Sequence, residues 1–151
     1  MKYSFTHSLM EGTSRPIIDN IYGGMALIDT GAEIPVCTLP VEILKKVFHA
    51  ELKVENAPIT GFGGRDYGSI YILEAFRWNQ LVFPFIPIFV PNNKHNIQFR
   101  WIFSASMLDR LEYHINMKKH VLTIYVPDDE SLERRLHIYD KNGKLHVLCE
   151  N

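Results

Sequence analysis

Apolar positions along the chain recur with the two-residue period typical of β-strands over most of its length. Such segments, alternating or short and apolar, occupy 2–9, 51–55, 70–73, 82–90, 113–115 and 121–126. Apolar runs also flank Gly23-Gly24 and Asn142-Gly143, and both dipeptides favour the tight turn of a β-hairpin. Pro84 and Pro87 cannot donate to a ladder, which indicates an edge or bulged strand at 82–90.

Two short segments have helical spacing instead. The first begins at Pro40, which suits a first helical position because it lacks the N–H group. Its apolar residues fall on one face: Val41, Leu44, Val47 and Phe48. The second helix is predicted over 107–111, with Ser104 or Ser106 placed to cap it. The predicted fold class is therefore all-β with two short helices.

The chain divides at a polar segment that starts with a proline. Residues 127–131, Pro-Asp-Asp-Glu-Ser, have the composition of a linker. We therefore expect one domain over 1–126, followed over 127–151 by the linker and a C-terminal β-hairpin appendage.

Composition narrows the function classes. The 151 residues are 46% hydrophobic and 22% charged, as in globular proteins. The net charge of −1 leaves no basic field for nucleic acid or a membrane surface. The longest apolar stretch, 81–90, is too short to span a bilayer, and the N-terminus lacks the apolar segment of a secretory signal. We expect a cytoplasmic protein that binds neither nucleic acid nor membranes.

The segment best suited to chemistry is Asp29-Thr30-Gly31-Ala32, which directly follows an apolar strand. Burial at a strand end disfavours the charged form of a carboxylate and so favours a shared or retained proton. Gly31 permits close backbone approach, and the Thr30 hydroxyl can bond outward. An ordinary turn, capped by Asp29 and completed by Thr30 and Gly31, explains the same residues without chemistry.

In its context this segment resembles the retropepsin-like aspartic peptidases, the single-domain family that includes retroviral proteases. The apolar-Asp-Thr-Gly-Ala segment at 26–32 matches the family's catalytic loop, and 59–64 lies where the family carries its flap hairpin. The stretch 101–108 is similar to the family's second apolar stretch and C-terminal helix, with Ser104 where glycine is usual. The segment 116–124 is similar to the closing strand–turn–strand. The resemblance thus covers most of the predicted first domain.

The resemblance implies a retropepsin-like acid-protease barrel and an aspartic endopeptidase, with no metal and no cofactor. This chemistry uses two carboxylates at one water molecule. Because the chain has a single Asp-Thr-Gly, the resemblance implies a two-fold homodimer with one Asp29 from each subunit. In it Thr30 would bond across the two-fold axis, and Gly31 would present its backbone to the substrate.

Substrate binding is implied for Ala32 and for the flap. Ala32 cannot donate a side-chain hydrogen bond to the carboxylates, unlike the serine of relatives that act in acid, so we expect activity nearer neutral pH. Gly61, Phe62, Gly63 and Gly64 would form a flap that closes over an extended peptide and excludes water. The peptide would bind by strand addition, with alternate side chains in apolar pockets.

Two alternative functions stay open at this point. The first is a peptide-binding or dimerisation module that keeps the fold without turnover. The second is a self-processing enzyme whose C-terminal hairpin occupies the cleft or the dimer edge.

Other candidate sites are less favoured. The seven histidines show no helical pair beside an acid, which favours solvated or core-edge residues over a zinc site. Cys37 is expected to be a buried structural thiol. The glycines of 61–64 are not followed by the Lys-Ser/Thr of a phosphate loop. Eight aromatic residues in the middle of the chain are expected in the core or the peptide cleft: Phe76, Trp78, Phe83, Phe85, Phe89, Phe99, Trp101 and Phe103.

Overall fold

The computed structural model describes residues 3–61, 64–94 and 98–150, with 60–61 and 64–66 described by their backbone alone. The described chain is mostly β, which confirms the predicted class at that level. It has one α-helix, α1 (Val41–Phe48), and one short 3-10 helix, η1 (Ala105–Leu108). Within the described ranges, no helix has the length and apolar character needed to cross a membrane.

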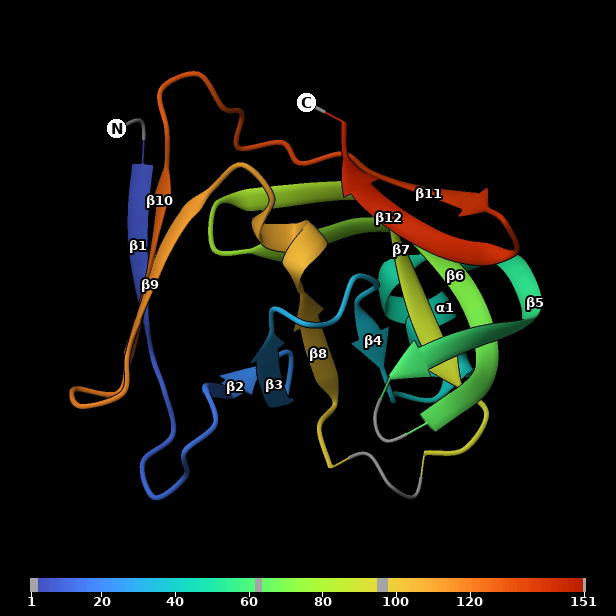
Figure 1. Ribbon diagram of the computed structural model, residues 1–151, viewed down its shortest axis with the longest axis horizontal. Helices are drawn as coiled ribbons and strands as arrows, with labels where there is room; N and C mark the ends of the chain where they lie inside the picture. Colours follow the sequence, from blue (N-terminus) through green and yellow to red (C-terminus); the bar gives the residue numbers. More distant parts are fainter. Residues whose placement is uncertain (1–2, 62–63, 95–97, 151) are drawn as a thin grey trace.

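The strands carry the labels of Figure 1. In chain order they are β1 (Tyr3–Ser8), β2 (Ile17–Ile21), β3 (Gly24–Asp29), β4 (Val36–Cys37), β5 (Glu51–Gly61), β6 (Gly64–Trp78), β7 (Leu81–Pro91), β8 (Trp101–Ser104), β9 (Glu112–Asn116), β10 (Val121–Val126), β11 (Leu136–Lys141) and β12 (Lys144–Cys149). Most coincide with the segments predicted from the alternating pattern, and both predicted hairpins, β2–β3 and β11–β12, are present.

The strands form three sheets. Seven strands make the largest sheet, in the order β2-β3-β8-β4-β7-β6-β5. A second sheet, β1-β10-β9, stands on the left of Figure 1 and joins the N-terminal strand to the strands that follow η1. The third is the hairpin β11–β12, which contacts β7, η1 and β5.

The position of β8 decides the course of the chain around Asp29. β8 lies between β3 and β4, parallel to β3 and antiparallel to β4 (Figure 1). Since β3 and β4 are consecutive along the chain, the loop that joins them must cross β8. It does so at the C-terminal end of β8, where Asp29 pairs with Ser104.

The two helices differ in detail from the sequence expectations. α1 begins at Val41, directly after Pro40, and buries Leu44 and Phe48. Val47, which the spacing predicts on the same face, is 57% exposed. The second helix is a single 3-10 turn, and Ser104 makes no side-chain cap there.

Of the two alternatives predicted for 82–90, an edge or a bulged strand, the edge strand is wrong. β7 lies inside the large sheet, between β6 and β4. However, β4 is two residues long and pairs with β7 at Phe89, so Pro84 and Pro87 lie on a stretch without a ladder partner on that side. The ladder with β6 is interrupted between the two prolines, where Phe85 has a φ of 56° and no partner, although the register is the same on both sides. A positive φ is unusual for an aromatic residue.

The aromatic residues of the middle segment form the centre of the core. Phe76 contacts Trp101 and Phe103, with ring centroids 5.2 and 5.8 Å apart, and Trp78 lies 4.7 Å from Phe103. Seven of the eight residues expected in the core or the cleft are buried, and Phe85, at 62% exposure, is the exception. The tilted and edge-on ring geometries are those that aromatic pairs prefer.

The hairpin β11–β12 turns at Asn142 and Gly143, which both have a positive φ, as a tight turn of this kind requires. It is joined to the rest of the chain through the segment after β10. Val82 of β7 donates its N–H to Leu132 O at 2.8 Å and accepts the N–H of Arg134 at 2.7 Å. The domain boundary at 126/127 stays a prediction.

A histidine anchors the N-terminal strand to the core. The indole Nε1–H of Trp78 donates to Nε2 of His7 at 2.8 Å. Nε2 must therefore carry a lone pair, which only the neutral ring provides. Burial lowers the pKa of His7 from its ordinary value of 6.5.

This shift predicts a loss of stability in mild acid. Below pH 6.5 the unfolded chain takes up a proton that folded His7 resists, so the free energy of unfolding falls with pH until His7 is protonated in the folded state too. Denaturant unfolding between pH 8 and 4.5 measures this slope. His7→Gln keeps an acceptor for Trp78 but cannot titrate, so its slope is expected to be smaller. Equal slopes in the two proteins would contradict the assignment.

Candidate active site

Asp29 is the last residue of β3 and begins a tight turn. The three residues before it are buried, and Asp29 itself is half-buried. Ala32 N–H donates to Asp29 O at 3.1 Å, and Gly31 N–H donates to Asp29 Oδ1 at 3.0 Å. The turn thus holds the carboxylate at the surface end of a buried strand.

The turn leaves Thr30 and the backbone of Gly31 accessible to solvent. A Cβ at Gly31 would lie 3.3 Å from Asp29 Oδ1, which is tighter than about nine in ten real Cβ contacts, so the carboxylate would have to shift slightly. Glycine at this position therefore keeps the space beside the carboxylate open. The three predicted catalytic residues, Asp29, Thr30 and Gly31, thus lie together in one exposed turn.

Two buried serines support the loop from below, where it crosses the end of β8. Ser106 Oγ donates to Glu33 O at 2.6 Å, and Ser104 Oγ lies 2.6 Å from Ser106 Oγ. Because the Ser106 proton is used on Glu33, Ser104 donates to Ser106. Ala105 N–H also donates to Ala32 O at 2.8 Å. Nothing in the sequence indicated the contact between Ser106 and Glu33, since partners 73 residues apart leave no local signal.

The carboxylate of Glu33, four residues after Asp29, receives donors from the C-terminal hairpin. His146 Nδ1 lies 3.0 Å from both carboxylate oxygens, and Val147 N–H donates to Oε1 at 3.1 Å. Sequence reasoning missed both Glu33 and His146. Neither belongs to a motif, and 113 positions separate them.

The predicted flap is a long β-hairpin, β5–β6, whose last described pair is Gly61 with Gly64. Phe62 and Gly63 lie outside the described residues. β6 also needs glycine at Gly68, where a Cβ would lie 2.3 Å from Val90 O of β7. In the strand order of the large sheet, the Asp29 turn and the glycine hairpin belong to strands near opposite edges.

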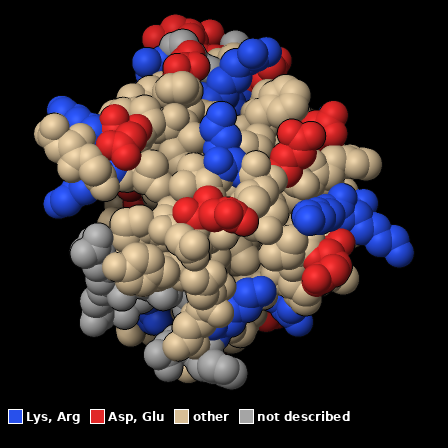
Figure 2. Space-filling view, turned by 90° about the vertical axis from the view of Figure 1, so that its right-hand side faces the viewer, with Lys and Arg blue, Asp and Glu red and all other residues tan. Residues whose placement is uncertain are grey.

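The other sites considered from the sequence are a cysteine thiol, a metal site and a basic surface. Cys37 is buried, as predicted, and burial raises the pKa of its thiol to about 12. Among the described residues, no three His, Cys, Asp or Glu side chains lie close enough together to hold a metal ion. On the face shown in Figure 2, basic and acidic side chains are interspersed, without a continuous basic patch among the described residues.

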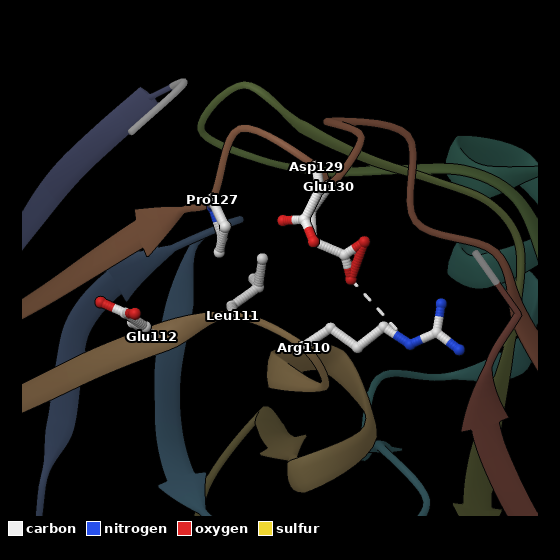
Figure 3. Close-up of a pocket in the computed structure, with 6 residues that line it drawn as sticks. All are labelled: Arg110, Leu111, Glu112, Pro127, Asp129 and Glu130. Carbon is white, nitrogen blue, oxygen red and sulfur yellow. Dashed lines mark ion pairs between the residues drawn. The ribbon is translucent and has the colours of Figure 1, made fainter.

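A pocket of about 510 Å³ opens between the start of β9 and the segment after β10 (Figure 3). Its lining residues are Arg110, Leu111, Glu112, Pro127, Asp129 and Glu130. Arg110 Nε lies 3.9 Å from Glu130 Oε1, and carboxylates make up much of the remaining wall (Figure 3). None of the predicted site residues lines this pocket, so it does not belong to the candidate active site.

A scan against known protein families and a search of curated protein sequences both found no match for this chain. The resemblance to retropepsin-like peptidases therefore stays a prediction from the residues of the sequence.

The serine support yields a testable order of stabilities. Ser106→Ala removes the donor to Glu33 O and the acceptor of the buried Ser104 hydroxyl, and we expect it to lower the free energy of unfolding by about 1–3 kcal/mol. Ser104→Ala leaves the bond from Ser106 to Glu33 intact and is expected to cost less, about 1 kcal/mol. Urea unfolding of both variants gives the comparison. If Ser104→Ala lowers the free energy of unfolding as much as Ser106→Ala or more, Ser106 is not the serine that holds the loop.

Proposed function

We propose that this protein is an aspartic endopeptidase of the retropepsin-like type, which acts as a two-fold homodimer on extended polypeptides. One observation carries the proposal: a carboxylate, Asp29, ends a buried strand in an exposed Asp-Thr-Gly turn, and backbone bonds and buried serines hold that turn in place. Fixed carboxylates beside open space are what general acid–base chemistry requires. The pairing of β3 with β8 also supports the proposal, because Asp29 lies opposite Ser104 at the end of β8 and the turn is thereby fixed on the sheet.

We propose a dimer because the chain has a single Asp-Thr-Gly turn. The chain has one Asp-Thr-Gly, whereas the proposed chemistry uses two carboxylates at one water molecule. A two-fold axis through the Asp29 turns brings the second carboxylate from the partner. Thr30, exposed at the tip of the turn, would bond across that axis and hold the two turns together.

The proposed reaction is the direct addition of water to a peptide carbonyl. Two close carboxylates share one proton, because both cannot be ionised together. The ionised Asp29 takes a proton from water, whose oxygen bonds to the carbonyl carbon, while the protonated Asp29 donates to the carbonyl oxygen. The C–N bond then breaks as the amine takes the proton that the first Asp29 received from water. One hydroxyl of the tetrahedral intermediate returns its proton to the other Asp29, which leaves a carboxylic acid and restores the dyad. No covalent intermediate with the protein forms.

The substrate would lie as an added strand beside the turn. Gly31 presents its backbone at an exposed position, and Ala32 offers a small apolar surface. The hairpin β5–β6, with Gly61 and Gly64 at its described end, would close over the peptide. Because Ala32 gives the carboxylates no side-chain donor, we expect cleavage nearer neutral than acidic pH.

A second candidate function is a peptide-binding or dimerisation module without turnover. It is favoured by the bond from Gly31 N–H to Asp29 Oδ1, which an ordinary turn also makes and which explains Asp29 without chemistry. The two functions differ in one respect, since only the peptidase requires the proton-transfer capacity of Asp29.

Replacement of Asp29 by asparagine separates them. Asn keeps an acceptor for Gly31 N–H but cannot accept the proton of water, so we expect hydrolysis to fall by at least about a hundredfold. The assay is cleavage of a diverse unstructured peptide library between pH 4 and 8, read by mass spectrometry, with protein verified as a dimer.

Asp140→Asn is the matched control. Asp140 Oδ1 also accepts a glycine N–H in a turn, that of Gly143 at 2.9 Å, but in the C-terminal hairpin. We expect this variant to cleave like the wild type. If the dimeric wild type makes no cuts that Asp29→Asn abolishes, the peptidase proposal fails and the binding module is favoured.

A further inference from the structure

Hydrogen bonds attach the C-terminal hairpin to the body of the protein at three places among the described residues. At the first, Val82 of β7 exchanges two backbone hydrogen bonds with the segment before β11. At the second, the buried guanidinium of Arg134 donates to Asp109 O, and Cys149 N–H donates to Asp109 Oδ2 at 3.4 Å. The third is the carboxylate of Glu33. The hairpin is therefore a packed element rather than a loose extension.

The apolar side of the hairpin is part of the core. Leu136, Val147 and Cys149 are buried within the same hydrophobic cluster as β3 and β8. β12 contacts both η1, which supports the Asp29 loop, and β5, the first strand of the proposed flap. The hairpin thus lies against the element that supports the Asp29 loop and against one strand of the proposed flap.

The contact at Glu33 fixes the second end of the loop that begins at Asp29. Asp29 is held by β3 and its pairing with Ser104. The carbonyl of Glu33 accepts a hydrogen bond from Ser106, and its carboxylate accepts one from Val147 N–H of β12. The ring of His146 is itself held by stacking on Tyr139, with centroids 5.4 Å apart. Three residues, 30–32, remain between the two fixed points.

We propose that Glu33 and His146 are positioning residues: their contact ties the C-terminal hairpin to the loop that carries Asp29 and holds the carboxylate in its reactive place. This inference rests on the proposed peptidase function. Neither residue touches the reacting atoms, and both act through the loop. The proposed Asp29 carboxylate must align with a second one across a two-fold axis, and small displacements of such a group lower the rate of catalysis. A contact that fixes the loop therefore affects the rate.

The same hairpin offers a matched control pair. His137 Nδ1 lies 3.7 Å from Glu150 Oε1, and both side chains are more than half exposed. This pair has the same chemistry as Glu33 and His146 but joins the hairpin only to itself. Glu150→Ala therefore tests the loss of a His–Glu contact without a change at the Asp29 loop.

The first test measures the loop directly, by amide hydrogen exchange resolved by NMR in the full-length dimer. Glu33→Ala is expected to speed exchange at Gly31, Ala32 and Val147 by about tenfold or more, because the loop and β12 lose their common contact. Glu33→Gln keeps an acceptor for Val147 N–H and is expected to stay within about threefold of the wild type. Unchanged exchange at Gly31 and Ala32 in Glu33→Ala would overturn the proposal.

The second test measures catalysis, with rates divided by the concentration of folded dimer. A positioning role predicts that Glu33→Ala lowers kcat by about tenfold and leaves KM within about twofold, whereas Glu33→Gln and Glu150→Ala keep most of the activity. The double variant Glu33→Ala/His146→Ala is expected to be no slower than Glu33→Ala, because the two residues act as one contact. Additive losses, or an equal loss in Glu150→Ala, would overturn the proposal.

The two tests distinguish failure of this inference from failure of the proposed function. A wild-type dimer that cleaves no peptide removes the peptidase function and, with it, the catalytic importance of the contact. An active wild type whose kcat and loop exchange are insensitive to Glu33→Ala leaves the peptidase function standing and removes only the positioning role.

Discussion

The insertion of β8 between two strands that are consecutive along the chain is the constraint on which the candidate site depends. Because β8 separates β3 from β4, the segment between Asp29 and Val36 has to cross the end of β8 instead of making a simple hairpin. A loop in that position can reach the backbone and serines at the start of η1, and it does so through Ala32 and Glu33. The same crossing leaves Thr30 and Gly31 at the surface.

Local features of this fold could be predicted from the sequence, because their causes are local. Gly23-Gly24 and Asn142-Gly143 specify their turns through backbone freedom, and the spacing of Leu44 and Phe48 predicts the buried face of α1. The Asp-Thr-Gly turn was likewise visible as a motif. Its turn geometry, with the Gly31 N–H on Asp29 Oδ1, is set by neighbouring residues.

Features that depend on distant partners could not be predicted. The parallel pairing of β3 with β8 joins segments more than seventy residues apart and has no local signature. The prolines of β7 indicated an edge or bulged strand, and the shortness of β4 explains why they are tolerated inside the sheet. The contacts of Glu33 with His146 and of Ser106 with Glu33 O are of the same kind, since each partner looks like an ordinary surface or capping residue in the sequence.

Asp29 thus has support at three levels. Backbone bonds within the turn orient Asp29, buried serines hold the loop on β8, and the hairpin holds Glu33 from the other side. What a single chain does not contain is the second carboxylate that the proposed chemistry needs. The central claim is therefore that two copies of Asp29 form one site.

Subunit mixing tests this claim most directly. Wild-type protein and Asp29→Asn are combined in equal amounts, exchanged to equilibrium and assayed at a fixed total concentration at which the protein is dimeric. If both carboxylates are required, only dimers of two wild-type subunits cleave, and about a quarter of the unmixed activity remains. A residual activity of about half would show that each subunit works alone and would contradict the shared site.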